Sequence, residues 1–393
     1  MKKSYISFLI MTLTLVNTSL INISSVQAAT VQSTNNKIIK VSLENIKDIM
    51  IDNSLDMKTY DNNLKKVKEE YDESKDEVKT AQTDKQDAED KLAADDKLDS
   101  NKTKQLQNDL TLAENNLDTK NTNLDTKTFN YTQAKLQYDQ KVESAVYQAQ
   151  QDYIKYLSTL ANKELQEDTA KSKEKNAQIS KLKYESGFMS KNDYISSTQD
   201  NTDSSDKLNE LINEEKLEKT KLCNELGISE ENATIITDIN EDIEKISKIN
   251  YDSDLKEMLD NNVDIRLANN NIDQLDSVDN ETDNDYTDAI NDYNKDNAEI
   301  SLQQKNNIAK INFKEQYDTL MNSYNSIKSS YNKITQEQNE YKITQSKYDY
   351  GFVSKNYVDN EKLTLDKDNA TFVNSRNKCY LDYLKYIQMK EGY

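Results

Sequence analysis

The chain has 393 residues, and its 71 acidic residues outnumber its 51 basic residues, which gives a formal net charge of −20. A nucleic-acid partner or an anionic membrane surface would require a basic face, so this charge argues against both. There is no histidine, which excludes a catalytic imidazole and a histidine-ligated metal, and nothing else in the sequence predicts an enzyme, a cofactor or a metal site. The mean hydropathy is −0.97, and the chain contains no proline. Together these two features fit long thin helices better than a disordered chain.

The first 28 residues have the features of a secretory signal peptide. Two lysines provide a basic start, residues 6–16 are an apolar stretch, and residues 26–28 (Val-Gln-Ala) form a small-residue cleavage site. The apolar stretch is shorter than the ~20 residues of a membrane-spanning helix, and no later segment approaches that length. We therefore expect an exported mature chain that has no membrane span of its own.

The opening of a long amphipathic helix occurs twice along the chain. Residues 50–58 (MIDNSLDMK) are matched by residues 258–266 (MLDNNVDIR). Ser42 and Ser253 precede these two segments, and a serine hydroxyl can cap the first turn of a helix. The match indicates an internal repeat rather than two unrelated domains.

The first repeat continues in a heptad pattern. Apolar and small residues step by alternating threes and fours over residues 64–81, and then recur every seven residues over 110–145. A sustained spacing of 3.5 residues is typical of a left-handed coiled coil. The polar run at residues 95–100 is the predicted turn between its two helices, and residues 276–284 are the counterpart in the second repeat.

A ten-residue phrase also occurs twice, as KYESGFMSKN over residues 183–192 and as KYDYGFVSKN over residues 347–356. The chain has only four glycines, and two of them, Gly187 and Gly351, occupy the same place in this phrase. Glycine adopts positive φ at little steric cost, so each phrase predicts a tight turn at the end of a long helix. Both copies of the repeat thus turn with the same chemistry.

The two repeats differ in length. The helix openings are 208 residues apart and the glycine turns 164 residues apart, so the first repeat holds 44 more residues between its signatures. Shared between two antiparallel arms, this surplus adds about 22 residues, or ~33 Å of helix, to each arm.

These signatures divide the chain into five predicted segments, with Gly227 as the C-cap that ends the first repeat. They are the signal peptide (1–28), an N-terminal segment (29–41), the first helical hairpin repeat (42–227), an inter-repeat linker (228–252) with a candidate strand at 233–237, and the second helical hairpin repeat (253–393). Cys223 and Cys379 fall at non-equivalent places in the two repeats, which favours two packing thiols over a disulfide.

The duplicated long helices, with Tyr-x-x-Gly-Phe-x-Ser at each turn, resemble the TolC-type outer-membrane efflux protein family. Residues 41–44 (VSLE) and the Asp-Asn segment after them are also similar to that family's first helix. The resemblance covers most of the mature chain and implies an all-α fold of long antiparallel coiled-coil hairpins, three copies of which form a hollow α-helical cylinder. It also implies that the glycine turns lie at the far tip of this homotrimer. There they would meet the adaptor, or membrane fusion protein, of an ABC-type or other export pump.

The resemblance assigns two sets of candidate site residues. The adaptor-docking tips would be Gly187, Phe188, Met189, Ser190, Gly351, Phe352, Val353 and Ser354. The family narrows its pore with acidic residues shortly after the second glycine, and the candidates for this constriction are Asp193, Tyr357, Asp359 and Asn360. Tyr357 and Asn360 stand where the family has acids, and Asp193 equally fits an acidic first-turn residue that favours the helix dipole.

The upper turns depart from the family pattern. Family members of two-membrane bacteria insert a pair of β-strands there, whereas residues 95–100 and 276–284 lack the apolar–polar alternation of ~9–11 residues that a membrane strand requires. We therefore expect a protomer without transmembrane β-barrel strands, exported to the wall or surface of a single-membrane bacterium. Two functions remain open: the exit duct of an efflux or secretion system, or a wall- or surface-associated coiled-coil structural protein without transport.

Overall fold

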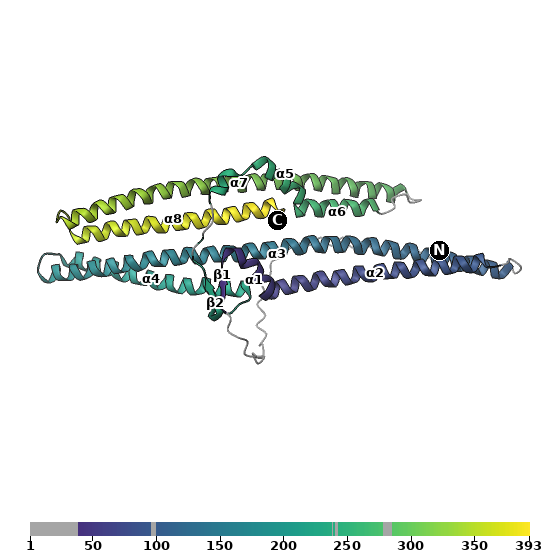
Figure 1. Ribbon diagram of the computed structural model, residues 1–393, viewed down its shortest axis with the longest axis horizontal. Helices are drawn as coiled ribbons and strands as arrows, with labels where there is room; N and C mark the ends of the chain where they lie inside the picture. The colour runs from purple at the N-terminus through teal and green to yellow at the C-terminus, as the bar shows by residue number, and fades with distance from the viewer. Residues whose placement is uncertain (1–37, 96–99, 238, 240–242, 278–284) are drawn as a thin grey trace, which may run out of the picture. The chain divides into compact units, whose positions relative to one another are not determined.

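The computed structural model describes residues 38–95, 100–237, 239, 243–277 and 285–393. Its strands and α-helices are β1 (Ile39–Val41), α1 (Ile46–Asn53), α2 (Leu55–Ala93), α3 (Ser100–Glu185), α4 (Lys191–Leu226), β2 (Ala233–Ile235), α5 (Tyr251–Asn261), α6 (Val263–Ser277), α7 (Asp285–Asp349) and α8 (Lys355–Lys390) (Figure 1). The predicted signal peptide, and most of both upper turns, lie outside the described residues. Within the described ranges, no helix combines the length and the apolar character needed to cross a membrane.

The predicted all-α class is confirmed. Long helices pack as antiparallel neighbours, α2 and α4 on α3, and α6 and α8 on α7, while α3 also contacts α6 and α8 (Figure 1). The strands β1 and β2 are three residues each and pair in parallel, with Ile39 opposite Ala233, so the strand predicted over residues 233–237 is present but shorter.

The predicted coiled-coil seam is present between α2 and α3. Ser74, Val78 and Ala81 of α2 are buried at heptad spacing. Tyr71 stacks on Tyr131 of α3, with ring centroids 5.3 Å apart. The apolar repeat therefore faces the neighbouring helix, as the 3.5-residue period requires.

The surplus of the first repeat is shared almost equally between two helices, as predicted. Helix α2 has 39 residues against 15 in α6, and α3 has 86 residues against 65 in α7. These differences of 24 and 21 residues lengthen the first pair by roughly 30–36 Å at 1.5 Å per residue.

The helix openings contain a break that the sequence match did not specify. Ser54 separates α1 from α2 with φ −62° and ψ 134°, and Asn262 separates α5 from α6 with φ −55° and ψ 121°. One residue of extended ψ thus interrupts both helices at equivalent places.

The expected cap at Ser253 is wrong: Asn250 caps α5 and accepts a hydrogen bond from the Ser253 backbone N–H at 3.3 Å. Ser42 does occupy an N-cap position, before a 3-10 helix at Leu43–Asn45.

The remaining two glycines pack against these breaks. Gly227 is the predicted C-cap of α4, with φ +69°, and a Cβ there would lie 2.7 Å from the Asn53 carbonyl carbon. Gly392 follows α8 with φ +101°, and a Cβ there would lie 2.3 Å from the Asn261 carbonyl oxygen. All four glycines therefore occupy two pairs of equivalent positions.

Two apolar cores lie beside these breaks. The first contains Met50, Tyr153 and Leu222, and the second contains Met258, Phe313, Leu320 and Tyr386. The predicted linker contributes to both, because Ile235 packs against the first core and Ile246 is buried in the second. The segment between the repeats is thus anchored at both ends.

Both cysteines are buried free thiols, as expected. Burial raises the pKa of Cys379 to about 12 and also raises the pKa of Cys223. Thiols kept protonated in this way are poor nucleophiles, so they act as packing groups.

Candidate functional site

Each repeated phrase forms the same turn. Helix α3 is closed by two backbone hydrogen bonds, from Gly187 N–H to the Tyr184 carbonyl at 3.0 Å and from Phe188 N–H to the Lys183 carbonyl at 2.8 Å. This pattern is a Schellman motif, in which a glycine of positive φ satisfies the last carbonyls of a helix. Gly187 has φ +75°, which explains why this position requires glycine.

The turn after α7 repeats these bonds residue for residue. Gly351 N–H donates to the Tyr348 carbonyl and Phe352 N–H to the Lys347 carbonyl, both at 2.8 Å, and Gly351 has φ +78°. The predicted turn chemistry is therefore confirmed at both phrases.

The two serines of the phrases begin the returning helices. The Ser190 hydroxyl accepts a hydrogen bond from Asp193 N–H at 3.2 Å, and the Ser354 hydroxyl accepts one from Tyr357 N–H at 3.3 Å. Ser190 also donates to the Asp193 carboxylate at 2.7 Å, a bond that has no equivalent at Tyr357. Both hydroxyls thus serve as N-caps of the returning helices.

Removing either cap should destabilise the protein by about 1 kcal/mol. We expect Ser190→Ala to cost a few tenths more than Ser354→Ala, because Ser190 also donates to Asp193. Urea unfolding would measure both changes, with Ser→Asp variants, which retain a cap acceptor, as matched controls. Alanine variants as stable as their aspartate counterparts would contradict the capping role.

The two phenylalanines are among the most exposed aromatic groups of the turns. The side chain of Phe188 is 84% exposed and that of Phe352 is 79% exposed. The next residues, Met189 and Val353, are half-buried. The phenylalanines are thus the more exposed apolar groups after each glycine, and they contribute little to packing within the chain.

The structure adds aromatic groups that the sequence reasoning did not select. Tyr350, beside Gly351, is 81% exposed, and only its place inside the repeated phrase could have pointed to it. Tyr184 stacks on Tyr194 with ring centroids 5.0 Å apart, which ties α3 to α4 just before the first turn.

The four candidate constriction residues are not brought together. Asp193 lies at the start of α4, and its carboxylate bonds to its own N-cap. Tyr357, Asp359 and Asn360 lie on α8, where Tyr357 is 49% exposed and Asn360 is exposed. Among them, Asp359 forms an ion pair with the other repeat.

That contact is part of an ion-pair network between α3 and α8. The Asp359 carboxylate pairs with Lys175 of α3, and with Lys355 of its own helix at 3.1 Å. The Lys175 hydrogen bond is the main cause that lowers the pKa of Asp359; burial opposes it and Lys355 assists it. One turn further, Lys362 lies 3.8 Å from Asp168 of α3.

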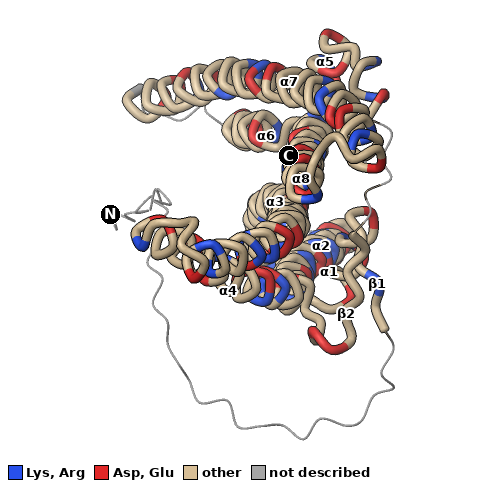
Figure 2. The backbone as a smooth tube through the Cα atoms, turned by 90° about the vertical axis from the view of Figure 1, so that its left-hand side faces the viewer, with Lys and Arg blue, Asp and Glu red and all other residues tan. Residues whose placement is uncertain are grey.

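These ion pairs place both glycine turns at the same end of the paired helices (Figure 1). Lysine, arginine and acidic residues are interleaved along the helices (Figure 2). Each ten-residue phrase, in contrast, holds two lysines and one acidic residue, a small positive excess in a chain of net charge −20.

Among the described residues, no cluster of cysteine and acidic side chains is arranged to hold a metal ion.

No protein-family model matches the sequence, and no curated protein matches it at the sequence level. Solved structures do match the fold. A membrane protein from Pseudomonas aeruginosa has a TM-score of 0.59 and 11% identity, over 91% of this chain and 92% of that chain. The outer membrane protein VceC of Vibrio cholerae has a TM-score of 0.51 and 11% identity, over 70% of this chain and 76% of that chain.

The Campylobacter jejuni CmeC outer membrane channel is similar to the same degree. Its TM-score is 0.51 with 12% identity, over 69% of this chain and 68% of that chain. At this level of identity the comparisons establish the fold. The chain has a TolC-type fold, as the repeated motif predicted.

Proposed function

We propose that this chain is the exit duct of an efflux or secretion system and docks onto an adaptor (membrane fusion) protein through its two glycine turns. The observation that carries the proposal is the pair of exposed phenylalanines, Phe188 and Phe352, held at equivalent places on two identical turns. Exposed aromatic groups on rigid supports are typical anchors of protein interfaces. The similarity to channel proteins supports transport, and we propose no catalytic activity.

Association into a homotrimer is part of this proposal. Apolar side chains stay exposed along one face of α7 at heptad spacing. They are Ile290, Tyr293, Ile300 and Ile311. An uncovered heptad seam favours packing against another helix, and a second copy of the chain supplies one. The number three comes from the family resemblance, and a monomer in light scattering at micromolar concentration would contradict it.

The location follows from the same proposal. We propose that residues 1–28 direct export and that the duct stands in the wall or at the surface of a single-membrane cell. Asp359, paired with Lys175, is the residue we retain as a candidate for narrowing the duct near its tips.

Binding to the purified adaptor protein of an export pump from the same cell tests the docking proposal. We expect Phe188→Ser and Phe352→Ser to weaken binding about 30-fold each, and more in combination, since interface anchors contribute about 2 kcal/mol or more each. Replacing Gly187 and Gly351 with valine should also abolish co-purification by deforming the turns. Leu112→Ser, at a 67% exposed site on α3 far from the turns, is the matched control.

Binding unchanged in the double phenylalanine variant would refute docking by these tips. A coiled-coil structural protein of the wall or surface would then be the better description of the chain.

A further inference from the structure

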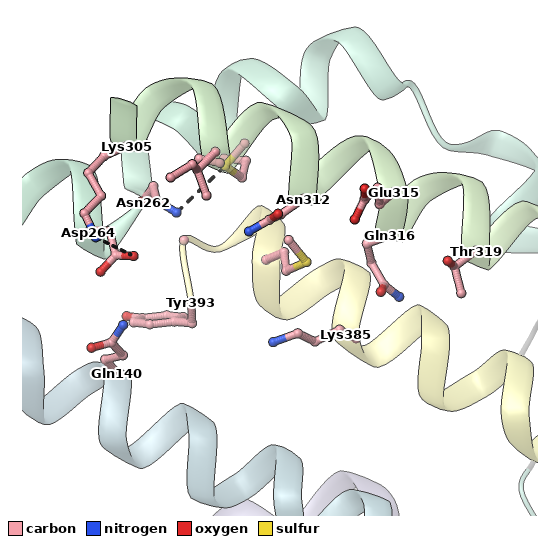
Figure 3. Close-up of a pocket in the computed structure, with 15 residues that line it drawn as sticks. Gln140, Asn262, Asp264, Lys305, Asn312, Glu315, Gln316, Thr319, Lys385 and Tyr393 are labelled. Carbon is pink, nitrogen blue, oxygen red and sulfur yellow. Dashed lines mark hydrogen bonds and ion pairs between the residues drawn. The ribbon is translucent and has the colours of Figure 1, made fainter. Parts of the chain in front are cut away.

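A cavity of about 470 Å³ lies where the end of α8 meets the start of α6 (Figure 3). Its walls come from α3, α5, α6, α7 and α8, so both repeats contribute to it. Gln140 of α3 and the C-terminal Tyr393 lie at one end, and Asn312, Glu315 and Lys385 lie around the centre. None of these side chains belongs to the glycine turns.

Lys385 is the unusual group in this cavity. Its ammonium projects from α8 into the open space (Figure 3), donates a hydrogen bond to Gln388 Oε1 at 2.8 Å, and lies 5.0 Å from the centroid of the Tyr147 ring. The side chain is half-buried and forms no ion pair with any acid in the described ranges. Burial lowers its pKa. An ammonium removed from water in this way favours a complementary anion.

Glu315 lies on the opposite wall, on α7 (Figure 3). Its carboxylate is exposed and likewise has no ion-pair partner in the part of the chain that the structure describes. Lys385 and Glu315 thus present opposite charges to one space without neutralising each other. A plain carboxylate ligand would satisfy Lys385 but would be repelled by Glu315, whereas a zwitterion satisfies both.

Part of the remaining lining suits a small aliphatic body, and the two other charged side chains of the cavity, Asp264 and Lys305, lie 3.9 Å apart and neutralise each other. Met258, Ala309 and Met389 contribute apolar surface, and the amide of Asn312 adds a hydrogen-bonding group. We propose that the cavity binds a small zwitterion of the α-amino acid class, free or as a dipeptide, with its carboxylate on Lys385 and its ammonium on Glu315. A ligand held there contacts α3 of the first repeat and α7 and α8 of the second, so it stiffens the joint between the repeats.

Isothermal titration calorimetry of the purified protein tests the charge requirement. L-leucine and L-alanyl-L-leucine are the zwitterionic probes, and 4-methylpentanoate and 3-methylbutylamine carry the same aliphatic group with one charge each. At least one zwitterion should bind, and both single-charge probes should bind at least tenfold more weakly. Whichever of the two zwitterions binds with the higher affinity shows whether the ligand is a free amino acid or a dipeptide. No binding by either zwitterion, or equal binding by 4-methylpentanoate, would overturn the proposal.

Two variants test the assigned groups. Lys385→Met and Glu315→Gln should each weaken zwitterion binding at least tenfold, and Lys385→Met should bind L-leucine no better than 3-methylbutylamine. Lys378→Met is the matched control, because Lys378 lies on the same helix, pairs with Asp382 at 2.7 Å and does not line the cavity. Glu315 is exposed, so its variant tests the site even where Lys385→Met folds poorly. Parental affinity in both variants would show that the cavity does not use these charges.

Discussion

Replacing Gly227 or Gly392 with alanine is expected to destabilise the protein by about 3–5 kcal/mol. Both glycines have positive φ, which alone costs an L-residue about 1–2 kcal/mol. The larger contribution is steric, because a Cβ would lie 2.7 Å from the Asn53 carbonyl carbon at Gly227 and 2.3 Å from the Asn261 carbonyl oxygen at Gly392.

Neither clash can be relieved by a side-chain rotation, because the groups in the way are backbone. At Gly392 the constraint is doubled, since its carbonyl accepts the Val263 N–H at 2.9 Å at the start of α6. Moving Gly392 away from Asn261 would break this bond and open the second core beside it. We therefore expect Gly392→Ala to loosen the α5–α6 break as well as to lower global stability.

Gly187→Ala is the matched control. Gly187 has a similar φ of +75°, but a Cβ there meets no atom within 4 Å. Alanine should then cost only the backbone strain of about 1–2 kcal/mol. Urea unfolding of the three variants would measure the difference. A cost at Gly227 no larger than at Gly187 would show that the close approach to Asn53 is not tight in solution.

These glycines also mark how far the sequence could specify the fold. The turns at Gly187 and Gly351 were predictable because ten contiguous residues repeat, and every bond of a Schellman motif is local. The equivalence of Gly227 and Gly392 was not visible, because their flanking sequences differ and each role depends on a contact with a distant helix break. Periodicity predicts which face of a helix is apolar, but not which distant backbone passes over it.

The candidate sites likewise divide into features set by local sequence and features set by contacts between distant segments. Exposure of Phe188 and Phe352 followed from the turn, whereas the pairing of Asp359 with Lys175 required the register between α3 and α8. The cap of α5 was misplaced because Asn250 and Ser253 are both good caps three residues apart. The cavity at Lys385 was invisible, since its walls come from helices far apart in the sequence.

A buried carboxylate in the first repeat carries the second large prediction. Lys155 and Lys221 both donate to Glu218 Oε1, at 2.7 and 3.0 Å, while the Glu218 side chain is 1% exposed. Its other oxygen, Oε2, has no hydrogen-bond partner among the described residues. We expect the double variant Lys155→Met, Lys221→Met to lose about 3–5 kcal/mol at neutral pH, because it leaves a buried charge without compensation.

The contribution of Glu218 to the pH dependence of the unfolding free energy should change sign in this variant. Burial acts to raise the pKa of Glu218, and the hydrogen bonds from Lys155 and Lys221 outweigh it, so the pKa in the folded protein is lowered. A carboxyl with a lowered folded pKa stabilises the protein above its unfolded pKa of about 4.3, and this contribution is lost as the pH falls through the folded pKa.

Without the lysines only the effect of burial remains, so the folded pKa of Glu218 rises above its unfolded value. Protonation then relieves the buried charge, and the variant should regain stability relative to the parent as the pH falls from 7 towards 5. Asp152 reinforces this trend, because its own pKa is raised first by burial and then by the charge of Glu218.

Adding Glu218→Gln to the double variant separates the charge from the lost packing of the lysines. The triple variant should recover most of the lost stability at pH 7 and show little difference from the double variant at pH 5. Lys173→Met is the exposed counterpart, since its partner Asp200 is 54% exposed and can be solvated, so its cost should stay within about 1 kcal/mol. If the double variant loses no more than Lys173→Met, the Glu218 carboxylate reaches water in solution, and the two lysines are ordinary surface partners.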